Sequence, residues 1–165
     1  MAGLTTRYGT PLAVILVALG LLFSNPAPGV ARLSIGLLAL SLAFNLALAK
    51  WVRTYLGDAS GWIRFRLFLN IALNLAQVYL LSPVWPPIWL MLTLTPLATA
   101  IYEDRASTLA SSCSISLLLL AINLMRGINS TMEWGMQLAY AAFIILMSLM
   151  VNVLSASSRV MSKPD

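Results

Sequence analysis

The chain has 165 residues, of which 60% are hydrophobic and only 9% are charged, and its formal net charge is +5. A soluble domain of this length cannot bury so much apolar surface, because small domains bury only part of what the unfolded chain exposes. The composition therefore predicts an integral membrane protein. The basic residues lie between apolar runs and form no basic face or arm, so nucleic acid is not an expected partner.

The residue types that are missing exclude several kinds of site. The chain has no histidine and a single cysteine, Cys113, which excludes histidine-based haem, zinc and copper sites, histidine acid–base catalysis and an internal disulfide. Serine and threonine are frequent, but no base accompanies them in a hydrolase-like pattern. We therefore expect no catalytic residues, no metal site and no enzyme activity.

Six apolar runs are candidates for helices that cross a bilayer, a crossing that takes about 20 residues. In chain order they cover residues 10–24, 30–49, 67–81, 87–102, 106–125 and 136–154. Proline, glycine or charged residues separate them, and these connections are short, which predicts that successive helices are antiparallel neighbours. The sequence thus predicts an all-α fold, a polytopic bundle of six transmembrane helices that forms one integral membrane domain over residues 1–165.

The first run needs separate treatment, because Arg7 followed by an apolar stretch also resembles a signal peptide. Residues 24–28 provide no small-x-small cleavage site, so we expect the first helix to be retained. An arrangement with five spans, without the first helix, would keep the same loops in place and leave the N-terminus outside.

The positions of the basic residues predict the orientation of the helices. With the N-terminus in the cytoplasm, eight basic residues lie inside and two, Arg32 and Arg126, lie outside. The inner set comprises Arg7, Lys50, Arg53, Arg64, Arg66, Arg105, Arg159 and Lys163. This positive-inside bias predicts a multi-pass protein of the cell membrane with both termini in the cytoplasm.

Tryptophans mark the expected interfaces with the lipid headgroups. Trp51 and Trp62 fall at the inner end of their spans, and Trp85, Trp89 and Trp134 fall at the outer end. This distribution is typical of the aromatic belts of membrane proteins.

Uncharged polar residues recur at helical spacing within the apolar runs. Asn70, Asn74 and Gln77 share one face of the third run. Similar stripes occur in the second, fifth and sixth runs, with members Ser34, Ser41, Asn45, Ser112, Ser116, Asn123, Gln137, Ser148 and Asn152. Amides that faced lipid would leave donors and acceptors unpaired, so we expect these stripes to make polar contacts between helices. The alternative for Asn70, Asn74 and Gln77 is a polar pocket that binds a small neutral ligand.

The loop from Ser82 to Trp89 combines three prolines with Trp85 and Trp89. Proline restricts the backbone and tryptophan anchors at headgroups, so one interpretation is an interfacial anchor. The other is a stacking surface on which Trp85 and Trp89 bind a planar lipid-soluble ligand such as a quinone. No other cofactor is expected.

The order of features from Arg64 to Arg159 resembles the six-span N-terminal sensor module of bacterial histidine kinases, of the quinone-sensing type. The features are the polar third run, the loop with proline and tryptophan, a fourth run with internal Pro96 that leads to Arg105, and a sixth run with a polar exit. This resemblance implies a signalling module of the bacterial inner membrane. Because the chain has no histidine, it implies the membrane module without the kinase.

These observations lead to an expected function and two alternatives. We expect a non-catalytic membrane module that senses a membrane-soluble ligand or binds a partner protein, and that signals through the sixth helix. The expected partners are the bilayer and another membrane protein or further copies of the chain. The alternatives are an accessory or assembly subunit of a larger membrane complex and a component of a small-molecule transporter.

Overall fold

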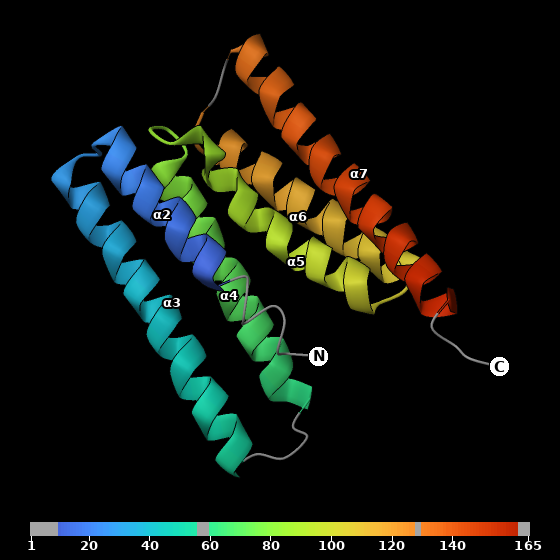
Figure 1. The fold of residues 1–165 in the computed structure, drawn as a ribbon. Helices are drawn as coiled ribbons and strands as arrows, with labels where there is room; N and C mark the ends of the chain where they lie inside the picture. Colours follow the sequence, from blue (N-terminus) through green and yellow to red (C-terminus); the bar gives the residue numbers. More distant parts are fainter. Residues whose placement is uncertain (1–9, 56–59, 128–129, 162–165) are drawn as a thin grey trace. The chain divides into compact units, whose positions relative to one another are not determined.

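The structure is a computed structural model that describes the backbone of residues 10–55, 60–127 and 130–161, and the side chains of residues 11–45, 68–127 and 130–158. Within these residues every regular element is helical and no strand occurs (Figure 1). The prediction of an all-α protein is confirmed. The helices are α2 (Thr10–Ser24), α3 (Pro28–Tyr55), α4 (Ser60–Leu81), the 3₁₀ helix η2 (Pro86–Trp89), α5 (Leu90–Tyr102), α6 (Arg105–Met125) and α7 (Thr131–Met161).

Three of these helices contain a stretch that is long and apolar enough to cross a membrane. The stretches are Pro28–Asn45, Arg105–Met125 and Thr131–Ser158. Shorter apolar helical segments cover Pro11–Ser24, Phe68–Leu81 and Pro86–Tyr102. Every predicted apolar run therefore corresponds to a helical segment of the structure.

The observed helices are in several places longer than the apolar runs. The first run coincides with α2, whereas α3, α4 and α7 extend beyond the runs at residues 30–49, 67–81 and 136–154. Serine, arginine and tryptophan all tolerate helical backbone, so a helix continues past the last apolar residue until a breaker ends it.

Left-handed backbone ends two of the helices. Asn25, directly after α2, has φ 44°, and Gly127, two residues after the end of α6, has φ 69°. Glycine and asparagine adopt this conformation at lower cost than other residues and are the usual residues after a helix C-terminus. These two positions thus account for the helix ends after the first and the fifth apolar runs.

The helices form two compact units, and the chain passes from one to the other between Met91 and Leu92. In the unit of residues 2–91, α3 packs against α2 and α4, and η2 packs against α2 and α4. Its buried apolar residues are Leu16, Val17, Leu73, Val78, Leu81, Ile88 and Met91.

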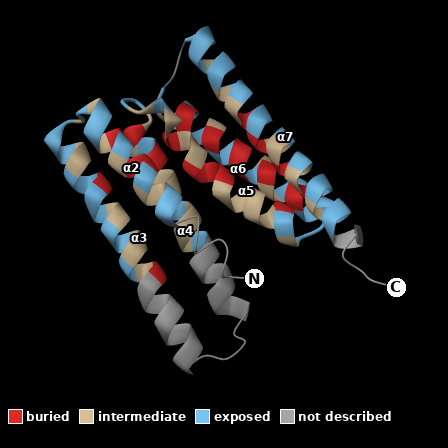
Figure 2. Cartoon of the chain, in the orientation of Figure 1, coloured by how far each residue is buried: buried red, intermediate tan, exposed pale blue. Residues whose placement is uncertain are grey.

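In the unit of residues 92–165, α6 and α7 pack along each other. Their buried residues lie on one stripe of each helix (Figure 2). On α7 that stripe is Ala141, Ile144, Ser148 and Asn152. Large apolar side chains cover the other faces, among them Leu117 on α6 and Leu146 and Met150 on α7. A surface of this kind suits contact with lipid or with another helix.

Candidate functional site

A pair of amides connects α3 to α4. Asn45 Nδ2 donates to Asn70 Oδ1 at 3.1 Å, and Asn70 Nδ2 donates back to Asn45 Oδ1 at 3.2 Å. The pair uses one donor and one acceptor of each amide, which satisfies groups that would be costly to expose to hydrocarbon.

A second contact joins the same two helices nearer to the end of α4. The Gln77 side chain donates through Nε2 to the backbone carbonyl of Ser34 at 2.7 Å, and both residues are buried. Ser41 and Asn74 are half-buried, and neither makes a hydrogen bond within the described residues. Two of the three amides that share this face of α4, Asn70 and Gln77, therefore contact α3 directly.

The reciprocal pair predicts strong coupling between Asn45 and Asn70. Replacing one of them by leucine leaves the other amide without its partner, while replacing both removes the unpaired groups. We expect the losses in free energy of unfolding of the two single variants to sum to more than the loss of the double variant. The difference, which is the coupling energy, should be about 0.6–1.7 kcal/mol. Detergent unfolding titrations of the four proteins measure it. Asn74→Leu is the control with no amide partner to orphan, and additive losses at Asn45 and Asn70 would contradict the pairing.

A polar seam also runs between α6 and α7. Ser116 Oγ donates to the Ala141 carbonyl at 3.1 Å, and Asn123 Nδ2 donates to Gln137 Oε1 at 2.8 Å. The hydroxyls of Ser112 and Ser148 behave differently from the prediction of contacts between helices, since they donate within their own helices to Leu109 and Ile144. Serine can satisfy its hydroxyl on a carbonyl of the preceding turn, so its small side chain here permits close packing instead.

Asn152 on α7 has three hydrogen-bond partners near the end of this seam. Its side-chain Nδ2 lies 3.0 Å from the Ala100 carbonyl, 3.1 Å from the Glu103 carbonyl and 3.1 Å from Thr108 Oγ1. The two carbonyls lie at the C-terminal end of α5, where helix carbonyls lack partners within the helix. One amide of α7 thus binds both the end of α5 and the start of α6.

Asp104 caps the start of α6. Its backbone is extended, with φ −74° and ψ 172°, and Oδ1 accepts from the Ser107 backbone N–H at 3.1 Å. Hydrogen bonds from the Ser107 hydroxyl and backbone hold the pKa of the Asp104 carboxyl below its ordinary value. This cap is not among the features predicted from the sequence, although an aspartate just before the start of an apolar run is a local signal for it.

The cap predicts a pH dependence at this turn. The pKa of Asp104 is lower in the folded chain than in the unfolded chain, so the cap contributes fully above the unfolded value of about 4 and is lost as pH falls through the lower folded value. We expect the Ser107 amide to exchange faster with solvent in that acid range, as measured by NMR. In Asp104→Asn, which caps without titrating, exchange should show no such additional rise, and an identical acid profile would contradict the assignment.

The loop that carries the tryptophans packs against α2. A Cβ added to Gly20 would lie 3.0 Å from Cδ1 and 3.1 Å from Cγ of Trp85, so the indole is in close contact with the α2 backbone. The rings of Phe23 and Trp85 are stacked with centroids 6.4 Å apart and planes 18° apart. Trp89 is half-buried at the end of η2. Phe23 therefore stacks beside Trp85, for which the sequence leaves open an interfacial anchor and a surface that binds a planar ligand.

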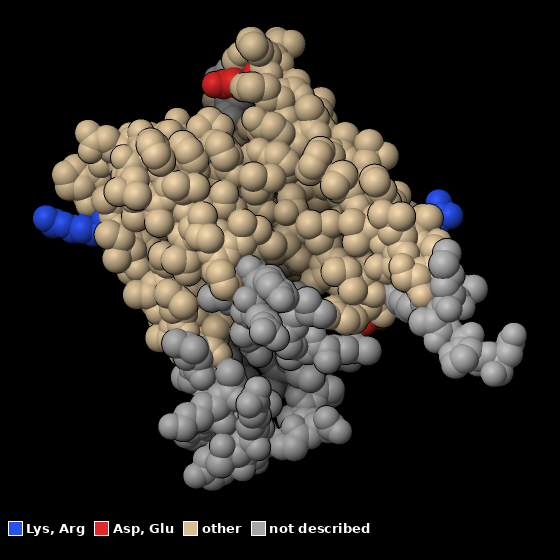
Figure 3. Space-filling view, in the orientation of Figure 1, with Lys and Arg blue, Asp and Glu red and all other residues tan. Residues whose placement is uncertain are grey.

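Charged side chains are few in the described part of the chain. They are Arg32, Glu103, Asp104, Arg105, Arg126 and Glu133, and none of them is buried. In the view of Figure 3 uncharged residues cover most of the described surface of each unit. Buried polar groups in the described residues are amides and hydroxyls.

Several residues of the predicted orientation and belts lie outside the described side chains. They are Arg7, Lys50, Trp51, Arg53, Trp62, Arg64, Arg66, Arg159 and Lys163. The expected orientation consequently stays a prediction.

Over residues 10–55, 60–127 and 130–161 the regular structure is all helical, and three helices of this part are apolar and long enough to cross a membrane. The chain matches no protein-family model, no curated protein and no solved structure. The resemblance to kinase sensor modules accordingly stays a prediction.

Proposed function

We propose that the chain is an integral membrane module with six transmembrane helices and both termini in the cytoplasm. It binds a membrane-soluble ligand or a partner protein and passes this event on through α7 without catalysing a reaction. The observation that carries the proposal is the contact of Asn152 on α7 with the Ala100 and Glu103 carbonyls and Thr108 Oγ1. A displacement of α5 or α6 at this turn acts directly on α7, because the three helices share one amide.

The length of α7 supports its role in transmission. Its 31 residues span about 46 Å, which exceeds the hydrocarbon thickness of about 30 Å. The exposed residues Ser157 and Ser158 lie near its C-terminal end. A helix of this length continues out of the bilayer as one rigid element, so a shift inside the membrane reaches the aqueous side.

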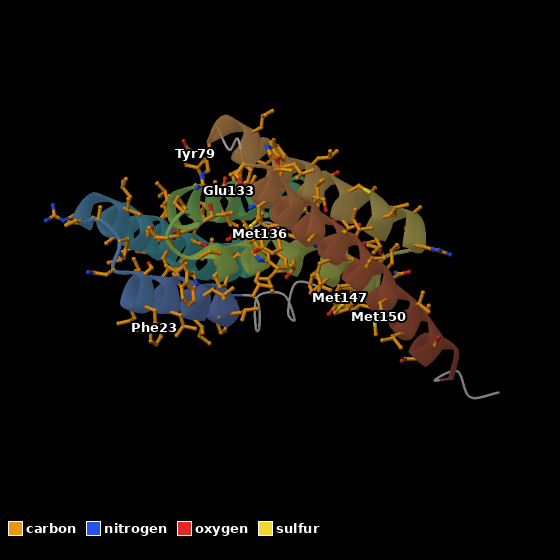
Figure 4. The ribbon with its side chains drawn as sticks, turned by 90° about the horizontal axis from the view of Figure 1, so that it is seen from above. Phe23, Tyr79, Glu133, Met136, Met147 and Met150 are labelled. Carbon is orange, nitrogen blue, oxygen red and sulfur yellow. The ribbon has the colours of Figure 1, made fainter. Side chains whose placement is uncertain are left out.

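Two observations bear on the alternatives. Exposed apolar side chains follow α7, including Met136 and Met150 (Figure 4), and methionine adapts well to a partner surface, which also suits an accessory subunit. A transport component would need a succession of free polar groups along α4, whereas Asn70 is paired with Asn45 and Gln77 Nε2 donates to the Ser34 carbonyl. The contacts therefore favour binding over transport.

Cysteine labelling tests the proposed topology. In a Cys113→Ser background, a membrane-impermeant maleimide applied to intact cells should label cysteines introduced at the exposed positions Val84 and Ser130. Cysteines at Glu103 and Ser158 should react only after the membrane is permeabilised. Labelling of Glu103→Cys in intact cells would contradict the orientation. A cysteine at Ala2 separates six spans, in which it is protected, from five, in which it reacts.

Two binding measurements test the proposed activity. A short-chain ubiquinone should quench tryptophan fluorescence of the protein in nanodiscs, with an apparent Kd that rises in Trp85→Ala and Trp89→Ala and is unchanged in the control Trp134→Phe. Unaltered quenching in the first two variants would reject the quinone. A partner protein should instead co-purify at fixed stoichiometry from mild detergent and dissociate from an α7 variant such as Met150→Lys. A chain that fails both measurements is not a binding module of this kind.

A further inference from the structure

Three buried side-chain atoms in the unit of residues 2–91 have no hydrogen-bond partner within the described residues. They are Ser34 Oγ, Gln77 Oε1 and Trp85 Nε1. A buried polar atom without a partner costs about 1–3 kcal/mol, so native proteins rarely keep one without a bound water or ligand. These atoms give the unit hydrogen-bonding capacity that its described side chains do not use.

Two of the three atoms lie together between α3 and α4. Gln77 Nε2 donates to the Ser34 carbonyl at 2.7 Å, which places the Gln77 amide, and with it Oε1, against the backbone of Ser34. Ser34 is 0% exposed and Gln77 is 2% exposed, so neither atom is open to the surroundings. The site is built from a helix pair that also carries the Asn45–Asn70 contact.

Ser34 differs from other helical serines of this chain. Ser114, Ser148, Ser157 and Ser158 each donate their hydroxyl to the carbonyl four residues earlier. The Ser34 hydroxyl makes no such bond, although the same geometry is available to any serine inside a helix. Its hydroxyl is consequently free to bind a group that lies between the two helices.

The unpaired atoms define what this group can be. Gln77 Oε1 only accepts a hydrogen bond, so the group must donate one, and the Ser34 hydroxyl can donate to the oxygen of that same group. A quinone carbonyl only accepts and would leave Gln77 Oε1 unpaired. An ammonium would leave the Ser34 O–H without an acceptor and would bring an unpaired charge into a buried, uncharged site. A neutral hydroxyl both donates and accepts.

We propose that Ser34 and Gln77 form a binding site for a neutral hydroxyl group between α3 and α4. The group is a water molecule or the hydroxyl of a membrane-soluble alcohol, since the hydrogen bonds are the same for both. This site is separate from the stacking surface expected of Trp85 and Trp89, and it does not depend on the proposed signalling function.

NMR of the full chain in phosphatidylcholine nanodiscs tests the site. The lipid has no hydroxyl, so a cross-peak between the Gln77 side-chain amide protons and water identifies a bound water. Adding 1-octanol distinguishes the sources. Replacement of the water cross-peak by one to octanol shows that the site accepts an alcohol, and persistence of the water cross-peak shows that it holds water. If neither partner gives a cross-peak, the site does not exist.

Matched variants and an internal control exclude general hydration. Asn123 is 2% exposed and its amide is paired with the Leu119 carbonyl and Gln137, so its side chain should show no cross-peak to water or octanol. Ser34→Ala should abolish the cross-peak at Gln77, because the bound oxygen loses its donor. Ser148→Ala, whose hydroxyl is paired within α7, should leave the cross-peak unchanged. A cross-peak that survives in Ser34→Ala would overturn the proposed site.

Discussion

Replacing Asn152 by aspartate is expected to destabilise the unit of residues 92–165 by about 3 kcal/mol, the largest loss of any single polar substitution that we consider. The carboxylate keeps the shape of the amide but cannot donate. It would face the Ala100 and Glu103 carbonyls, which the Asn152 amide now binds at 3.0 and 3.1 Å. Asn152 is only 6% exposed, so water cannot replace these bonds.

A graded series distinguishes lost hydrogen bonds from repulsion. Asn152→Ala removes the donors without adding charge and should cost roughly 1–2 kcal/mol. Ser148→Ala, one turn earlier on the same face, should change stability by less than about 0.5 kcal/mol, because its hydroxyl binds only its own helix. Detergent unfolding titrations followed by circular dichroism give the three values. Equal stability of Asn152→Asp and the unmodified chain would show that the contact does not form.

Replacing Gly20 by valine is expected to separate α2 from the tryptophan loop. A Cβ at this position already lies 3.0 Å from Cδ1 of Trp85, and the two methyl groups of valine need further space. The indole cannot retreat without losing its stacking on Phe23. Overpacking of this kind costs about 1–3 kcal/mol, so we expect a lower free energy of unfolding and altered tryptophan fluorescence.

The control for this substitution is another helical glycine of the same unit. A Cβ on Gly36 meets nothing within 4 Å, so Gly36→Val should be neutral or slightly stabilising. Combining Gly20→Val with Trp85→Ala should remove the clash, and the double variant should lose less stability than the sum of the two single variants. Strict additivity would mean that Gly20 and Trp85 are not in contact.

The Asp104 cap is a local feature that can be predicted from neighbouring residues, although the pattern of apolar residues does not indicate it. The apolar pattern shows residues 103–105 only as a short charged connection between two runs, whereas in the structure Asp104 accepts a hydrogen bond from the Ser107 N–H and caps α6. A cap needs only residues within one turn of helix, so a reading of helix start signals could have found it. The predicted limits of α3 and α7 are too short for a different reason. Hydropathy gives the length of the apolar stretch, and a helix can continue beyond it.

The partners of the amides cannot be predicted from any local sequence pattern. Helical spacing places Asn70 and Gln77 on one face of α4, but it does not say that Asn70 meets Asn45 while Gln77 meets the Ser34 backbone. Both choices depend on the register of α3 against α4. The same holds for Trp85, whose contact with Gly20 requires the chain to return across two helices.

The sequence by itself determined the helical class, the number of apolar runs and most of their limits, because apolar length and helix breakers act between near neighbours in the chain. Only the tertiary structure decided which polar groups pair, that Asn152 joins three helices and that Ser34 and Gln77 retain unpaired atoms. The physical reason is that a hydrogen bond tolerates only a few tenths of an ångström of variation in its donor–acceptor distance. Residues distant in sequence are brought to this distance only by the packing of whole helices.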